Sequence, residues 1–219
     1  MKKTFALLIM ISLITVCYGQ AEDDQETGRT GRDGDMVTLI GKSSSIGGYG
    51  GISTLYSQID SKDAFVFGAR GAVIMGHVFA FGIAGAGFIN EFQYDIGLDD
   101  NVGLAGGYGG LFFEPIIMPR FPVHVSIPVT VGVGGVGLTT YHNHWDNDNV
   151  MVDRSDAFFV VEPGIELELN ITKFFRFSLG GYYRYTSDIN VSDVDLSRSI
   201  PKDALRGFSA GATFKFGFF

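Results

Sequence analysis

Two polar residues, His124 and Ser126, stand one residue apart in a valine-rich run and could supply a base and a nucleophile. A histidine that takes the proton of a serine, with an acid to orient the ring, is the arrangement used for acyl transfer. Because side chains two positions apart share one face of a β-strand, His124 and Ser126 would lie on the same face. The same pattern suits two small polar residues inside a folded domain, and this second interpretation is preferred.

A second group of candidate ligands lies in the segment His142-Asn143-His144-Trp145-Asp146-Asn147-Asp148. The side chains of His142, His144, Asp146 and Asp148 carry nitrogen and oxygen atoms of the kinds that bind divalent metals. The segment lacks the glycine and the final glutamate of a calcium-binding loop. Acidic residues are common in surface loops for solubility alone, so we expect a solvated loop with neither a metal nor another cofactor.

Eight charged residues are each expected on the polar face of a segment whose opposite face is apolar. They are Arg70, Glu114, Glu162, Glu166, Glu168, Arg176, Arg184 and Lys215. Strict alternation of this kind is typical of a β-strand with one apolar side. Buried charges must be paired, and here four positive groups match four negative ones. We therefore expect a network of ion pairs in the interior.

The elements that would position these residues are β-strands. Eight runs rich in Val, Ile, Phe, Tyr and Gly are expected to be strands: 45–58, 63–76, 79–92, 102–114, 122–141, 156–170, 174–187 and 205–219. Runs of this length are long for a soluble sandwich and suit tilted strands that cross a membrane. Short turns alternate with longer polar connections, as in outer-membrane barrels. The sequence predicts an all-β fold, a closed eight-stranded antiparallel up-and-down transmembrane β-barrel over residues 43–219.

Two local features can be predicted more closely. A three-residue turn at Ile171–Lys173 would place Glu168 directly opposite Arg176 on the inner face. Pro128 and Pro163 fall inside expected strands, although a closed barrel has no edge strand to hold a proline. Each proline is therefore expected to mark a β-bulge.

The first residues predict export. Lys2 and Lys3 precede an apolar stretch that ends near Cys17 and Gly19, which is typical of a secretory signal peptide over residues 1–19. A lipoprotein signal with an acylated Cys17 is the alternative, and the bulky Val16 disfavours it. Residues 20–42 are acidic and predict a flexible periplasmic segment. The net charge of −8, without a basic stripe, argues against a nucleic-acid partner.

The signal peptide, the eight alternating runs and the closing GFSAGATFKFGFF resemble the small eight-stranded outer-membrane β-barrels of the OmpA transmembrane-domain and OmpX kind. Glycine-rich barrels of unassigned role are the most similar in character, and the resemblance covers about residues 43–219. It implies a place in the gram-negative outer membrane, with extracellular loops and both termini in the periplasm. It also implies that the barrel-assembly machinery reads the last strand, where Phe218, Phe216 and Phe214 alternate.

A resemblance in fold does not supply an activity. An eight-stranded barrel is just wide enough to be filled by side chains, so we expect a non-enzymatic protein with a structural or surface-binding role. We expect a monomer whose partners are outer-membrane lipid and lipopolysaccharide. Two alternatives stay open. His124-Val125-Ser126 resembles the H-x-S motif of lipid A deacylases, which would make the protein a lipid-modifying enzyme, and a path between the interior charges would make it a narrow channel.

Overall fold

The computed structural model describes residues 46–96, 100–141, 150–191 and 200–219. The expected signal peptide over residues 1–19 and the acidic segment over residues 20–42 lie outside this part of the chain. Within it, no helix has the length and apolar character needed to cross a bilayer.

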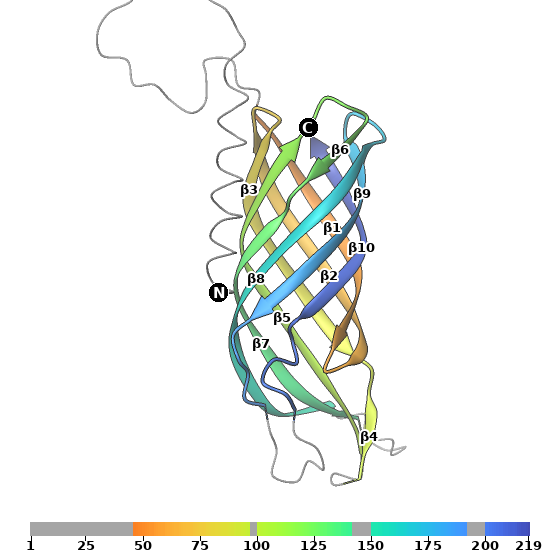
Figure 1. The fold of residues 1–219 in the computed structure, drawn as a ribbon, viewed down its shortest axis with the longest axis vertical. Coiled ribbons are helices and arrows are strands. Elements are labelled where there is room, and N and C mark those ends of the chain that lie inside the picture. Colours follow the sequence, from red (N-terminus) through yellow and green to blue (C-terminus); the bar gives the residue numbers. More distant parts are fainter. Residues whose placement is uncertain (1–45, 97–99, 142–149, 192–199) are drawn as a thin grey trace, which may run out of the picture. The chain divides into compact units, whose positions relative to one another are not determined.

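In the described part of the chain, ten strands form one antiparallel sheet that closes on itself (Figure 1). They are β1 (Ile46–Ile59), β2 (Lys62–Met75), β3 (Phe79–Asn90), β4 (Gln93–Asp95), β5 (Asp100–Ile117), β6 (Val123–Ser126), β7 (Val129–Tyr141), β8 (Val150–Asn170), β9 (Phe175–Thr186) and β10 (Gly207–Phe218). Both β6 and β7 pair with β5 on one side and β8 on the other, so together they fill one position of the ring. The three-residue β4 pairs only with the start of β5, where it continues the side of the ring occupied by β3. With β1 paired to β10, the predicted eight-stranded closed barrel is confirmed.

Connections of two kinds leave the two ends of the barrel. At the end that we call the turn end, residues 76–78, 118–122 and 171–174 join the strands. At the opposite loop end, residues 60–61 join β1 to β2, and β3, β7 and β9 end there at Asn90, Tyr141 and Thr186. Asp60 and Ser61 form a two-residue hairpin turn with φ values of 56° and 60°. Such a turn follows the right-handed twist of its strands, which explains why the β1–β2 connection is so short.

Side chains alternate strictly between the outside and the lumen. Large apolar residues remain exposed on the outside of the strands, among them Ile52, Phe67, Ile83, Leu111, Val133, Phe159, Ile165, Leu179 and Phe208. The residues between them are buried, including charged ones such as Glu166 and Lys215. This is the reverse of a soluble protein, in which apolar groups leave water and charges stay in it. The expected strands with one apolar face and one face that carries charged residues are confirmed.

The prediction that Pro128 and Pro163 mark bulges is wrong. The register of β6 and β7 against β8 is the same on both sides of Pro128, and the register of β8 against β9 is the same on both sides of Pro163. Each proline only interrupts the pairing, because it lacks the N–H that a ladder bond needs. The carbonyl oxygen of Pro128 still accepts a ladder bond, which the N–H of Gly164 donates at 2.8 Å. The register of β7 against β8 shifts at a different place, between Leu138 and Thr139.

The loop-end half of the lumen is built around an apolar core, with a few buried polar groups beside it. Ile59, Val66, Phe88, Leu104, Leu138 and Phe158 from the strands form its core. Side chains from the β9–β10 connection complete it, namely Ile189, Val191, Ile200, Ala204 and Leu205. Backbone bonds fix this connection over the opening, including one from the N–H of Asp60 to the Ala204 oxygen at 2.9 Å. The loop end of the lumen is therefore filled by side chains from both the strands and a connection.

Candidate functional site

The turn-end half of the lumen contains a compact group of charges centred on Lys215 of β10. Its ammonium nitrogen lies 2.6 Å from Glu114 Oε1 and 3.0 Å from Glu166 Oε2, and it also donates to Glu168. All four side chains are at most 1% exposed. An ammonium group has three N–H bonds, so Lys215 can donate one to each carboxylate. We call Arg70, Glu114, Glu166, Glu168, Arg176 and Lys215 the lumen charge cluster.

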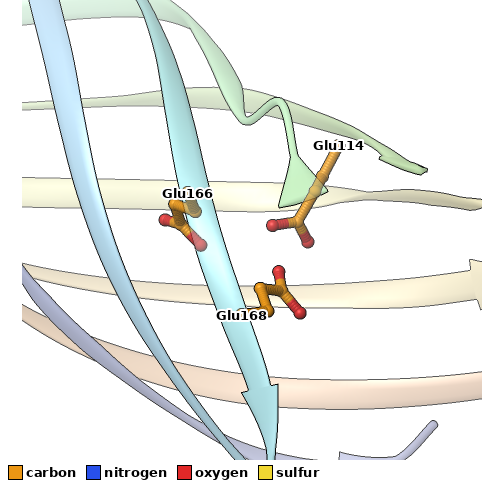
Figure 2. A group of neighbouring side chains, drawn as sticks. All are labelled: Glu114, Glu166 and Glu168. Carbon is orange, nitrogen blue, oxygen red and sulfur yellow. The ribbon is translucent and has the colours of Figure 1, made fainter. Parts of the chain in front are cut away.

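The three carboxylates of the cluster converge on one region (Figure 2), where one oxygen from each lies within 4.8 Å of the others. Such a group of oxygens has the composition of a cation site, and like charges this close repel strongly unless a cation separates them. Lys215 is that cation, because its nitrogen already contacts all three groups. The arrangement is therefore an internally neutralised ion cluster.

Two arginines complete the charge balance. One nitrogen of Arg70, on β2, lies 2.7 Å and 2.8 Å from the two oxygens of Glu166, on β8. Arg176, on β9, lies 3.5 Å from Glu168. The cluster thus contains three cations and three carboxylates, which is the condition for burying charges without an unpaired one.

The expectation that Glu168 and Arg176 lie directly opposite each other is wrong. In the register of β8 and β9, Arg176 faces Asn170, while Glu168 faces Ser178. The connection between β8 and β9 is longer than the three residues predicted, because β9 begins only at Phe175. Arg176 still reaches Glu168 on the diagonal, and its guanidinium also lies 4.0 Å from the centre of the Phe219 ring.

Hydroxyl groups from β1, β6 and β9 donate to the carboxylates of the cluster. Tyr49 donates to Glu114, and Tyr182 donates to Glu166. Ser178 donates to the second oxygen of Glu166 at 3.0 Å. Sequence reasoning missed both tyrosines and assigned Ser178 no role. The signal for Tyr182 was present, because the alternation that directs Tyr183 outward directs Tyr182 inward. Tyr49 lies in a glycine-rich run whose alternation is weak, so only the structure places it.

His124 and Ser126 are both buried on the inner face of β6, as their spacing predicts. Among the described residues, no hydrogen bond joins the two side chains, and each contacts a carboxylate instead. The Ser126 hydroxyl lies 2.6 Å from Glu168 and 3.1 Å from Glu114, while His124 Nε2 lies 3.0 Å from the other oxygen of Glu168. Glu168 therefore separates the serine from the imidazole. A base must contact the nucleophile whose proton it takes, and here the serine proton is directed at a carboxylate of the ion cluster.

The remaining two charged residues, Glu162 and Arg184, also face the lumen but stand apart from the cluster. Arg184 donates to the carbonyl oxygen of Leu205 at 2.8 Å and to the Ser57 hydroxyl at 3.2 Å. Its guanidinium lies 5.5 Å from the centre of the Phe88 ring. Glu162 accepts a hydrogen bond from Tyr108 at 2.7 Å. Arg184 thus holds the β9–β10 connection in the loop-end opening, and does not form a contact ion pair with Glu162.

The candidate metal ligands His142, His144, Asp146 and Asp148 lie outside the described residues, so the prediction of a solvated loop stays a prediction.

Comparison with solved structures identifies the architecture. The chain matches Neisserial surface protein A with a TM-score of 0.52 at 9% sequence identity, over 81% of this chain and 100% of that one. The fold is that of a small outer-membrane β-barrel. Weaker matches are the N-terminal β-barrel domain of Pseudomonas aeruginosa OprF (TM-score 0.41, 12% identity, 78% and 97% coverage) and Ail, the attachment invasion locus protein of Yersinia pestis, solved with a heparin analogue (0.40, 13%, 78% and 97%).

No protein-family model matches the chain, and no curated protein matches it in sequence. The resemblance to small outer-membrane barrels inferred from the alternating runs is confirmed at the level of the fold.

Proposed function

We propose that this protein is a non-enzymatic β-barrel of the gram-negative outer membrane, with the loop end outside the cell and the turn end in the periplasm. The observation that carries the proposal is the inverted distribution of side chains. Ile83 is 69% exposed and Phe159 is 72% exposed on the outside, while Glu114, Glu166 and Glu168 are fully buried in the lumen. A bilayer is the solvent in which this distribution is favourable.

The filled lumen supports a structural role or a surface-binding role through the loops. The charges of the turn-end half are held in mutual contacts, and the loop-end half is closed by apolar side chains. An ion that crossed the barrel would have to displace both layers. A narrow channel is therefore not favoured by any contact in the described part of the lumen.

The alternative of a lipid-modifying enzyme is weakened by the position of Ser126. A lipid A deacylase has to present its nucleophile to acyl chains outside the barrel. Ser126 is fully buried on the lumen side and donates to the ion cluster.

The outer surface also suggests the partners. We propose that outer-membrane lipid surrounds the apolar belt, with lipopolysaccharide at its loop-end edge, and that the barrel functions as a monomer. The outer face of β10 carries Phe208, Ala210, Ala212, Phe214, Phe216 and Phe218 at every second position. This is the pattern that we propose the barrel-assembly machinery reads.

Four measurements on the full chain test the proposal. The protein should fractionate with outer membranes, and its migration on gels should change with heating. Planar bilayers containing it should show no stepwise conductance, and the mass of lipid A from cells that express it should match that from cells that do not. Recovery as a soluble periplasmic protein would contradict the membrane location. A conductance that responds to charge reversal at Glu162 would favour the channel, and an altered lipid A mass that reverts in Ser126→Ala would favour the enzyme.

A further inference from the structure

A small cavity remains in the lumen between the lumen charge cluster and the apolar core of the loop-end half. Its volume is about 40 Å³. One wall is made of small residues, among them Gly68, Ala84 and Ala86. The side chains of Glu162 and Arg70 line the cavity, together with those of Thr130 and Tyr182. The small side chains of this wall do not extend as far as the charged side chains opposite, and the cavity is the space left between them.

Two polar atoms of residues that line the cavity lack hydrogen-bond partners among the described residues. One is Oε1 of Glu162, whose other oxygen accepts the bond from Tyr108. The second is Nε of Arg70, whose terminal nitrogen is engaged by Glu166. Glu162 is only 8% exposed. A buried carboxylate oxygen and a buried guanidinium nitrogen without partners are both unfavourable, so both call for a ligand.

The chemistry of the two atoms defines that ligand. Oε1 of Glu162 requires a donor, and Nε of Arg70 requires an acceptor. Water is both. One buried water occupies roughly 10–15 Å³ of such a cavity, so the volume suits about three molecules. A cation would add a positive charge beside Arg70, although the four positive and four negative side chains named above already balance.

We propose that this cavity is a binding site for a cluster of about three water molecules that bridges Glu162 and Arg70. The site completes the polar interior: Glu162, which no cation contacts among the described residues, is hydrated from inside the barrel. The inference rests on the lumen geometry alone and does not depend on the membrane location proposed above.

A crystal structure at a resolution that shows ordered water tests the site directly. The expected result is density within hydrogen-bond distance of both Glu162 Oε1 and Arg70 Nε. Crystals soaked in a thallium(I) salt distinguish water from a monovalent cation, because only a bound cation gives an anomalous peak there. A cavity without density, or one with a thallium peak, overturns the proposal.

Substitutions that fill the cavity test it in solution. Ala84→Val places two methyl groups in the cavity and should lower the urea midpoint of unfolding, because the displaced water leaves Glu162 unsolvated. In a Glu162→Met background the carboxylate is gone, and the same Ala84→Val change should leave the midpoint unchanged or raise it. If the cavity is dry, or if Ala84→Val acts only by overcrowding, the substitution should shift the urea midpoint equally in both backgrounds. An equal shift therefore overturns the proposal. The comparison is made in detergent, so it is valid even if the outer-membrane assignment fails.

Discussion

The ammonium nitrogen of Lys215 lies 2.6 Å from a carboxylate oxygen of Glu114, although 101 residues separate them along the chain. Lys215 is on β10 and Glu114 is on β5, and these strands are not neighbours in the ring. Their side chains meet because the lumen of an eight-stranded barrel is narrow enough for two side chains to span it. The contact ties opposite walls of the barrel together, so the cluster contributes to barrel stability as well as to lumen filling.

Lys215→Met should destabilise the barrel strongly. Without the ammonium group, three buried carboxylates would lie close together, and only Arg70 and Arg176 would remain to balance their charge. Breaking a buried ion pair in this way costs about 3–5 kcal/mol. Urea unfolding in lipid vesicles measures the loss of unfolding free energy. Lys202→Met is the matched control, because Lys202 is exposed in the β9–β10 connection and should change stability by less than about 0.5 kcal/mol. Equal effects of the two changes would show that the cluster does not stabilise the fold.

Glu168 should be coupled more strongly to Lys215 than to Arg176. Lys215 donates directly to Glu168, whereas Arg176 lies 3.5 Å away and also contacts the Phe219 ring. Double-mutant cycles with alanine at each position measure the two coupling energies, which for residues in contact are about 0.5–3 kcal/mol. The Lys215 cycle is expected near the upper end of that range and the Arg176 cycle near the lower end. The opposite order would contradict the geometry of the cluster.

The outside of β9 should reject a charge. Leu179 is 52% exposed at an outward position, and an arginine at the centre of a bilayer costs about 2–4 kcal/mol. Leu179→Arg should therefore impair folding into lipid vesicles. The same residue introduced at the exposed loop-end position Asp203 should have almost no effect. If Leu179→Arg folded into vesicles as efficiently as Asp203→Arg, the outer surface would not face lipid.

Gly164 should not tolerate a side chain. A Cβ atom at this position of β8 would overlap the ring of Tyr182 on the adjacent strand, and that ring is held by its hydrogen bond to Glu166. Gly164→Ala should therefore reduce stability by about 1–3 kcal/mol, the usual effect of overpacking. Gly181→Ala is the control, since a Cβ there meets open space. Thermal unfolding of the two variants should show a clear loss for the first and little change for the second.

Much of the fold could be predicted from the sequence, because strand side chains alternate with a period of two. The parity of each run was enough to direct Glu162, Glu166 and Glu168 into the lumen and Phe159, Val161 and Leu167 away from it. The order of short turns and longer connections was enough to predict an antiparallel barrel. These are local properties, so they can be inferred without knowing which strands are neighbours.

The partners of the charged residues were decided only by the tertiary structure. Alternation shows which face a residue occupies, but not its height in the barrel or what lies across the lumen. Arg70 meets Glu166 from 96 residues away, and Lys215 meets Glu114 from 101 residues away. The β8–β9 register placed Asn170, and not Glu168, opposite Arg176. Such contacts depend on the register of every strand around a closed ring, and a change of two residues in one turn moves a side chain past its partner while keeping its face.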